Sequence, residues 1–241
     1  MNNSKIKILQ LYPRDMNIYG DYGNVLVLKR RLQWYGYSVD LLTYNPGDKF
    51  PEEVDILVGG GGQDSGQSKI QSDLLKIGPK LKQLAEDGTP MLVICGLYQL
   101  FGKFFKTLSG ETIRGIGLID IETFGGEERL IGNIVTHSEQ FGDIIGYENH
   151  SGQTFLGRDV EPLGKVRLGA GNNLMDGFEG VYYKNVIGSY LHGSLLPKNP
   201  KIADFLIKQA VKRKNGEFKP TKKIDDSLAE SARRIARHRP R

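Results

Sequence analysis

The fold is decided by two apolar runs that each end in glycine: residues 55–62 read DILVGGGG, and residues 90–96 read PMLVICG. Neither run alternates between apolar and polar residues, so each is expected to form a strand that is buried on both faces. A helical pattern from Leu74 to Glu86 lies between them and is closed by Asp87 and Gly88. Strand, helix and strand in this order predict a parallel sheet that is covered by helices.

The same alternation extends toward the N-terminus. Residues 6–12 (IKILQLY) and 39–42 (VDLL) are short apolar runs with the character of strands. Between them a helix is expected from Asn24, because its apolar residues recur at spacings of three and four and Gly36 is placed to end it. These elements add two more strands to the predicted parallel sheet.

The second half of the chain has a different pattern. Residues 119–136 and 144–155 are typical of antiparallel strands, with many glycines between them. Two shorter runs, 181–183 and 185–191, are expected to be strands that lead to His192. The sequence therefore predicts an α/β fold: a central parallel sheet flanked by helices, with an antiparallel strand portion in the second half.

The domain organisation follows from where the apolar patterns stop. A helix is expected over residues 200–214, and we interpret residues 1–214 as a single domain. Residues 215–241 are polar, basic and poor in large apolar side chains. They are expected to be a tail that is disordered or is ordered by a partner.

The charge of the chain is concentrated at its end. The 241 residues carry a formal net charge of +5, but residues 211–241 alone hold 11 Lys and Arg against 4 Asp and Glu. The remainder is mildly acidic, and residues 219–241 contain no Phe, Tyr or Trp on which bases could stack. No specific nucleic-acid partner is expected.

The single cysteine excludes an intramolecular disulfide and metal sites built from several thiolates. No apolar run approaches the roughly 20 residues that span a bilayer, and the first residues do not have the pattern of a signal peptide. We expect a cytoplasmic protein with no transmembrane segment and no bound metal.

Cys95 is the first candidate for chemistry. It stands at the end of a buried strand and enters a glycine turn, which is the arrangement of a nucleophile elbow. A helix N-terminus behind it would favour the thiolate. Position alone does not separate this interpretation from an inert cysteine in the core.

A cysteine nucleophile needs a base, and the chain offers four histidines. His192 follows an apolar run and is expected at a strand end, where catalytic groups collect in α/β sheets. His150 lies in the antiparallel part, His137 is interpreted as a surface residue, and His238 lies in the basic tail. A histidine that simply packs in the core remains an alternative for both His192 and His150.

Three motifs carry a resemblance to a known family: CGLYQ at 95–99, GYENHSG at 146–152 and GSYLHG at 188–193. Together they resemble the class I glutamine amidotransferases, and in particular the cobyric-acid-synthase-like branch. The resemblance implies a flavodoxin-like α/β fold. Further segments, chiefly 17–24 and 171–180, are similar to the glutaminase subunits of lipid II isoglutaminyl synthases.

The resemblance implies that Cys95 is the nucleophile and His192 its general base and acid. It also implies a set of substrate-binding residues, which are Gly60, Gly61, Gly96, Gln99 and Arg129. The glycines would frame the glutamine carbonyl and its oxyanion, and Gln99 would be a substrate-side or packing group. Arg129 would clamp the α-carboxylate, although a solvated arginine beside two glutamates is an alternative. His150 is expected to give structural support.

Two departures from the commoner class I pattern concern the catalytic groups. Val93 and Leu97 stand where glycines are usual around the cysteine, and Ser194 stands where an acid usually follows the histidine. Without that acid, His192 is expected to be oriented by a backbone group or by a partner subunit. On this basis we expect the isolated chain to hydrolyse glutamine slowly.

The activity implied by the resemblance is hydrolysis of L-glutamine to glutamate and ammonia. The four-glycine loop is followed by Gln63 and Asp64 rather than by the lysine of a Walker loop, so ATP and Mg are expected on a partner and no cofactor in this chain. The implied partner is a Mur-ligase-like synthetase subunit that amidates the α-carboxylate of D-glutamate in lipid II.

Three alternatives stay open from the sequence. The ammonia acceptor could be of the cobyrinic-acid type. The chain could be a non-catalytic α/β binding module. A cysteine protease or esterase could use a similar elbow.

Overall fold

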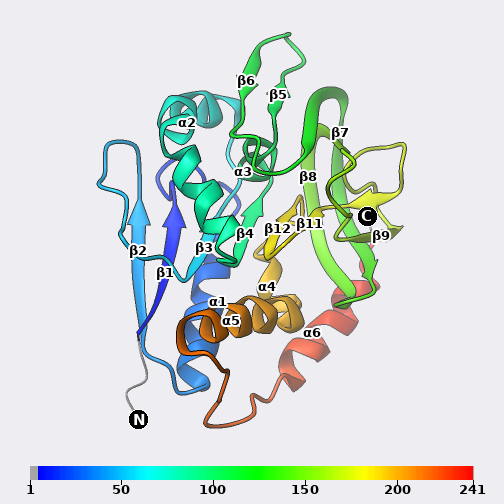
Figure 1. Ribbon diagram of the computed structural model, residues 1–241. Coiled ribbons are helices and arrows are strands. Elements are labelled where there is room, and N and C mark those ends of the chain that lie inside the picture. Colours follow the sequence, from blue (N-terminus) through cyan, green and yellow to red (C-terminus); the bar gives the residue numbers. More distant parts are fainter. Residues whose placement is uncertain (1–4, 241) are drawn as a thin grey trace.

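A parallel sheet forms the centre of the molecule (Figure 1). The computed structural model describes residues 5–240. The strand order of this sheet is β11-β12-β4-β3-β1-β2, and all neighbours pair in parallel except β11 with β12. Its strands are β1 (Ile6–Leu11), β2 (Val39–Tyr44), β3 (Ile56–Gly59), β4 (Met91–Ile94), β11 (Val181–Tyr183) and β12 (Val186–Ser189).

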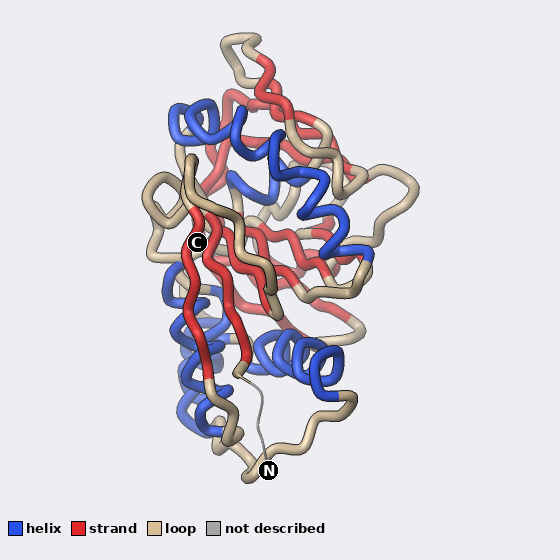
Figure 2. The backbone as a smooth tube through the Cα atoms, turned by 60° about the vertical axis from the view of Figure 1, so that its left-hand side comes forward, coloured by secondary structure: helices blue, strands red, loops and turns tan. Residues whose placement is uncertain are grey.

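Helices lie on both sides of this sheet (Figure 2). Chain direction explains this, because β1 leads outward to β2 whereas β3 leads the opposite way to β4, and right-handed crossovers then place α1 and α2 on opposite faces. The helix α5 packs against α1, α4 and β3. The helices are α1 (Tyr22–Trp34), α2 (Asp64–Glu86), α3 (Gly96–Phe101), α4 (Leu195–Lys198), α5 (Pro200–Asn215) and α6 (Ser227–Arg237).

The second sheet is mostly antiparallel, as expected for the second half of the chain. Its order is β10-β9-β7-β5-β6, and β8 pairs with β7 in a long hairpin. A register shift between Gly125 and Leu130 bends this hairpin. The strands are β5 (Phe104–Lys106), β6 (Thr112–Arg114), β7 (Ile121–Ser138), β8 (Gly142–Leu156), β9 (Gly164–Leu168) and β10 (Phe178–Glu179).

The predicted fold class is confirmed, with differences at particular elements. The helix expected from Leu74 begins at Asp64 instead. The sequence did not indicate this earlier start, because the first turns of the helix are polar and have no periodic apolar residues. One end of that helix faces the cavity described below, where polar side chains are exposed to a hollow rather than packed. The short strands β5, β6, β9 and β10 were not predicted, since two to five residues give too little periodicity.

The C-terminal segment differs from the expected tail. Residues Ser227–Arg237 form α6, which packs against β7, β8 and α4. The buried guanidinium of Arg31 anchors the chain before this helix, because it binds both Asp204, at 2.9 Å, and Asp226, at 2.5 Å. Arg233 then donates hydrogen bonds to the main-chain carbonyl groups of Asp143 and Lys198. Such anchoring by distant charges leaves no local trace in the sequence.

Among the described residues, none of the helices combines the length and the apolar character that crossing a bilayer requires. Within the same part of the chain, His, Cys, Asp and Glu side chains form no cluster of three or more suited to a metal ion.

Candidate active site

Four strands of the parallel sheet end at the same edge and bring their following residues together. Cys95 follows β4 and His192 lies three residues after β12. Asp21 lies on the loop after β1, and Gly61 lies on the glycine loop after β3. Carboxyl ends of parallel strands are the usual place for a site in an open α/β sheet.

The backbone of Cys95 is held in a conformation that places its sulfur at the end of the sheet. Its φ of 49° lies in the left-handed region, which residues other than glycine seldom adopt. The turn is fixed on both sides, because the Cys95 N–H donates to the Ser189 carbonyl and the Gln99 N–H donates to the Cys95 carbonyl. Strain held in this way is typical of a nucleophile elbow.

His192 is buried beside Cys95. Its backbone N–H donates to the Tyr147 carbonyl at 2.7 Å, which joins the end of the parallel sheet to β8. Burial by itself lowers the pKa of His192, but the neighbouring Cys95 and Asp21 side chains outweigh it and raise the pKa to about 10. The histidine therefore carries its proton at neutral pH, and a protonated imidazole is the kind of neighbour that favours a nucleophilic cysteine.

Asp21 supplies the carboxylate that the sequence analysis did not find. Its side chain is 2% exposed, and its Oδ1 lies 3.8 Å from Nδ1 of His192. The other oxygen, Oδ2, accepts the N–H of Gly61 at 2.7 Å. The structure thus adds a buried carboxylate to the backbone group and the partner subunit that were expected to orient His192, although at this separation Oδ1 and Nδ1 form no hydrogen bond. Slow hydrolysis by the isolated chain stays a prediction.

Glycines give these groups room. A Cβ on Gly61 would lie 2.7 Å from Cε1 of His192 and 3.2 Å from Cβ of Cys95, and one on Gly60 would lie 2.9 Å from Cβ of Asp21. A Cβ on Gly96 would lie 3.0 Å from the backbone nitrogen of Gly62. The N–H of Gly61 is already bound to Asp21, so Gly61 contributes space rather than a donor for an oxyanion.

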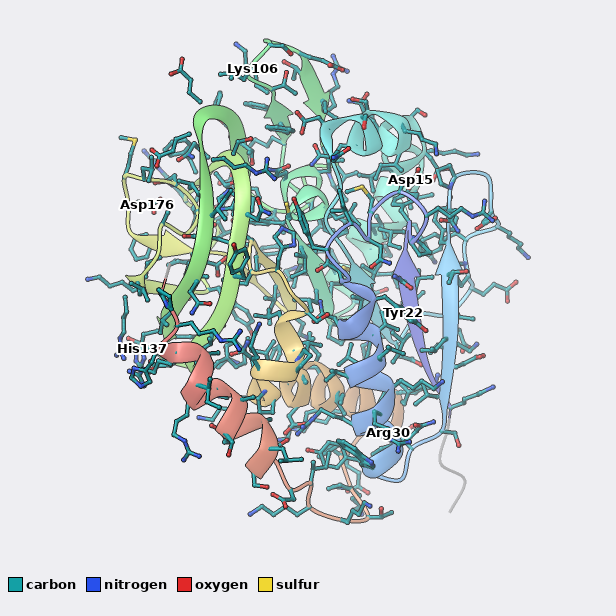
Figure 3. The ribbon with its side chains drawn as sticks, turned by 180° about the vertical axis from the view of Figure 1, so that it is seen from behind. Asp15, Tyr22, Arg30, Lys106, His137 and Asp176 are labelled. Carbon is teal, nitrogen blue, oxygen red and sulfur yellow. The ribbon has the colours of Figure 1, made fainter. Side chains whose placement is uncertain are left out.

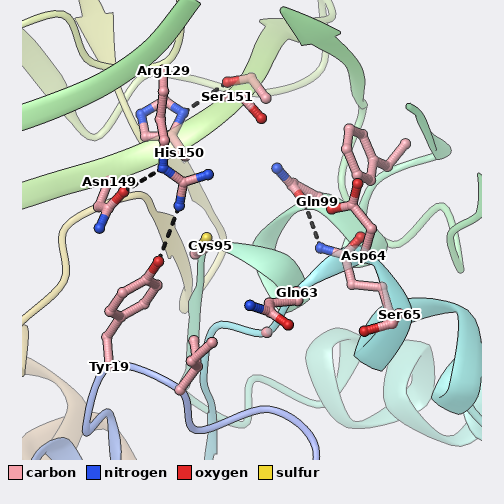
Figure 4. Close-up of a pocket in the computed structure, with 15 residues that line it drawn as sticks. Tyr19, Gln63, Asp64, Ser65, Cys95, Gln99, Arg129, Asn149, His150 and Ser151 are labelled. Carbon is pink, nitrogen blue, oxygen red and sulfur yellow. Dashed lines mark hydrogen bonds between the residues drawn. The ribbon is translucent and has the colours of Figure 1, made fainter. Parts of the chain in front are cut away.

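A cavity of about 390 Å³ opens above Cys95 (Figure 4). Arg129 reaches into it from the β7–β8 hairpin. Its Nε donates to Oδ1 of Asn149 at 2.7 Å, and one terminal nitrogen donates to the Tyr19 hydroxyl at 3.0 Å. The guanidinium is thus held in place at the wall of the cavity, with Cys95 at its base.

Gln99 forms part of the wall and its amide is engaged within the protein. Its Oε1 accepts a hydrogen bond from Gln67 at 2.6 Å, and its Nε2 donates to the Tyr190 hydroxyl at 3.0 Å. Of the two roles expected for Gln99, these bonds favour packing over contact with a substrate.

His150 also lines the cavity, and its ring is fixed. The ring stacks on Tyr190 at 3.6 Å, and Nδ1 lies 2.8 Å from the Gly152 carbonyl, which can only accept. The proton therefore sits on Nδ1, and burial lowers the pKa of His150 to about 3. Among the described residues Nε2 makes no hydrogen bond, and this atom is itself buried rather than exposed to the cavity.

The remaining two histidines lie elsewhere. His137 is half-buried on β7 (Figure 3). It binds Asp143, which also pairs with Arg237 of α6. His238 follows α6 and is exposed.

Residues 7–200 match the family described as CobB/CobQ-like glutamine amidotransferase domain, and the chain belongs to this family. It is 41% identical over 221 residues to the lipid II isoglutaminyl synthase (glutamine-hydrolyzing) subunit GatD of Staphylococcus aureus, covering 91% of this chain and 90% of that protein. The subunit GatD of Streptococcus pneumoniae is 39% identical, over 94% and 88% of the two chains.

The fold is shared with solved structures. A crystal structure of a glutamine amidotransferase superposes with a TM-score of 0.60 at 17% identity, over 84% of this chain and 98% of that one. A glutamine amidotransferase from Thermotoga maritima superposes with a TM-score of 0.56 at 18% identity, over 96% and 93%.

Behind the site, the buried carboxyl group of Glu179 fixes the strand end that leads to His192. Its Oε1 accepts the Ser189 hydroxyl at 3.0 Å and the Tyr190 N–H at 2.8 Å. Burial raises the pKa of Glu179 to about 7. In the folded chain this group therefore binds a proton more strongly than it does in the unfolded chain.

The change Glu179→Gln is expected to stabilise the protein in a pH-dependent way. A folded-state pKa above the unfolded value stabilises the native state at low pH, and this contribution is lost as pH rises from about 4.5 to about 7. The variant should match the wild type near pH 4.5 and exceed its unfolding free energy by up to roughly 3 kcal/mol above pH 7. Urea unfolding across this range measures the difference.

Glu86→Gln is the matched control, because Glu86 is exposed and its partners, Lys184 and the Tyr183 hydroxyl, lie at the surface. A stability difference between Glu179→Gln and wild type that does not change with pH would contradict the proposed titration.

Proposed function

We propose that this chain is the glutamine-hydrolysing subunit of a lipid II isoglutaminyl synthase. The observation that carries the proposal is Cys95 at the base of a cavity whose wall holds Arg129, with the buried side chains of His192 and Asp21 beside it. The similarity to two GatD subunits over nine-tenths or so of each chain supports the choice within the family.

The chemistry begins at Cys95. Its thiolate attacks the side-chain carbonyl carbon of glutamine, and the carbonyl oxygen becomes an oxyanion that faces the backbone around Gly96. His192, which carries a proton beside the sulfur, gives that proton to the departing nitrogen, so ammonia leaves and a thioester remains. The neutral imidazole then takes a proton from water, whose oxygen attacks the thioester and releases glutamate.

Asp21 orients His192 for this proton transfer. A carboxylate beside Nδ1 stabilises the imidazolium and directs the other ring nitrogen toward the sulfur and the leaving group. The separation of 3.8 Å between Oδ1 and Nδ1 closes to a hydrogen bond with a small shift of either side chain. Asp21 is a positioning residue, since it acts through His192.

Substrate binding falls to the two ends of the cavity. The guanidinium of Arg129 is suited to the α-carboxylate, because planar N–H donors pair with the two oxygens of a carboxylate. Of the glycines expected at the substrate, Gly61 lies beside Cys95 and His192, whereas Gly60 gives room to Asp21 and Gly96 packs closely against Gly62.

The acceptor of the ammonia belongs to a partner. We propose a Mur-ligase-like synthetase subunit that binds ATP and Mg and amidates the α-carboxylate of D-glutamate in lipid II. The names of the two GatD proteins, each called a subunit of lipid II isoglutaminyl synthase, support this assembly. We further propose that the complex works in the cytoplasm, with residues 1–214 as the amidotransferase domain.

A cobyrinic-acid-type acceptor is the weaker alternative. A probable cobyric acid synthase of Methanothermobacter thermautotrophicus is 29% identical over 213 residues, but the match covers only 41% of that protein. The two GatD proteins have higher sequence identity to this chain, and the match covers nearly the whole of each of them.

Cys95→Ser is expected to abolish glutamate release from L-glutamine. Serine is a far weaker nucleophile here, because the imidazolium of His192 stabilises a thiolate but not an alkoxide, and we expect a loss of at least about 1,000-fold. The assay uses the chain alone and with a co-expressed synthetase subunit, and it also measures amidated lipid II with the complex. Glutamate release by Cys95→Ser at the wild-type rate would contradict the proposal.

Arg129→Gln is expected to raise the KM for glutamine by about 30-fold or more and to change kcat much less, because a carboxylate clamp acts before and during the reaction alike. Steady-state glutamate release measures both constants. Arg114→Gln, on the exposed strand β6, is the control. An unchanged KM in Arg129→Gln would show that the α-carboxylate binds elsewhere.

A further inference from the structure

Ser194 occupies the position where the commoner class I pattern has its acid, and it does something different there. It directly precedes α4 as the N-cap residue, yet its hydroxyl makes no capping bond to that helix. The hydroxyl donates instead to the carbonyl of Gly20 at 2.8 Å. Gly20 is the residue before Asp21, so the bond joins the loop after His192 to the loop that carries the carboxylate.

The backbone conformation of Ser194 indicates that its side-chain hydroxyl has a role of its own. Its φ of 50° lies in the left-handed region, where glycine has no steric cost and serine does. A Cβ on Gly23, across the contact, would collide with the Ser194 side chain, so the two segments are closely packed. A strained non-glycine residue that bonds a loop beside the active site is expected to be kept for that bond.

Two further hydrogen bonds hold residues 17–24, which are the loop after β1 together with the first residues of α1. Within the loop, the N–H of Tyr22 donates to Oδ1 of Asn17 at 2.8 Å. Across to the segment after His192, the N–H of Leu196 donates to Oδ1 of Asn24 at 2.9 Å. The bond of Ser194 is therefore one of two that attach this loop to the same segment.

This loop supplies two contacts to the imidazole of His192. Asp21 faces Nδ1, and the ring of Tyr19 lies 4.4 Å from the imidazole ring, centre to centre. The Tyr19 hydroxyl also accepts a hydrogen bond from Arg129. The position of this loop thus determines where the Asp21 carboxylate and the Tyr19 ring lie against His192. It also determines where the Tyr19 hydroxyl supports Arg129, the proposed clamp for the substrate carboxylate.

We propose that Ser194 is a positioning residue for the proton-transfer pair: its hydroxyl holds Gly20 so that the carboxylate of Asp21 stays at Nδ1 of His192. The proposal deepens the function proposed above and rests on it for its role in glutamine hydrolysis. In this chain the residue two places after the histidine thus orients a carboxylate that comes from another strand end.

The test is the reactivity of Cys95, which is the chain's only cysteine. The full chain is alkylated with iodoacetamide near pH 6.5 and near pH 9, and the rates are followed by mass spectrometry. The ratio of the two rates reports the imidazolium-supported thiolate, because loss of that support slows alkylation at the lower pH most. The variants are Ser194→Gly, Asp21→Asn and the double variant.

Ser194→Gly removes the hydroxyl and relieves the strained φ, so the fold should be retained and its melting temperature is measured alongside. We expect the rate ratio to fall by about three- to tenfold in Ser194→Gly, as for one lost hydrogen bond, and further in Asp21→Asn. The double variant should equal Asp21→Asn alone, because Ser194 acts through Asp21. Ser231→Ala, which removes a hydroxyl on α6 far from the site, is the matched control.

An unchanged ratio in Ser194→Gly would overturn the proposal, and so would a double variant in which the two losses multiply. Alkylation needs no turnover of glutamine, so the result stands whether or not the wild type releases glutamate. Glutamate release is measured on the same samples, and its absence in the wild type would count against the proposed function alone.

Discussion

The carboxylate of Asp21 is the interaction on which the arrangement of this site depends. It is buried, accepts the N–H of Gly61 and faces His192, so it joins the loops after β1, β3 and β12. A buried carboxylate needs such partners, because an unpaired charge in the interior is costly. The imidazolium of His192 is the partner on one side, and its own charge is stabilised in turn by Cys95.

Charge also explains how the proposed reaction would be directed. Arg129 presents a fixed positive charge at one wall, whereas His150 stays neutral because burial lowers its pKa to about 3. At the base of the cavity, a thiolate on Cys95 would tolerate the neutral side-chain amide of glutamine but would repel a carboxylate at short range. The same repulsion disfavours rebinding of glutamate, whose side chain is a carboxylate, once the thioester has been hydrolysed.

Much of this could be predicted from the sequence, because strands, glycine turns and their neighbours are local. The runs that end at the glycine loop and at Cys95 predicted the parallel sheet, and the run before His192 predicted only that this residue follows a strand. Asp21 could not be placed in the same way, because it is far from His192 in the sequence and the fold alone brings the two together. The position two residues after the histidine, where an acid is usual, holds Ser194. The helix α6 escaped prediction because distant carboxylates around Arg31 hold the chain before it.

The most direct test of the account is the protonation of His192, measured by ¹⁵N NMR of the imidazole nitrogens of the full chain between pH 5 and pH 10. The account predicts that both nitrogens of His192 keep their protons at pH 8, since Cys95 and Asp21 raise its pKa to about 10. A His192 signal that is already neutral at pH 8 would contradict it.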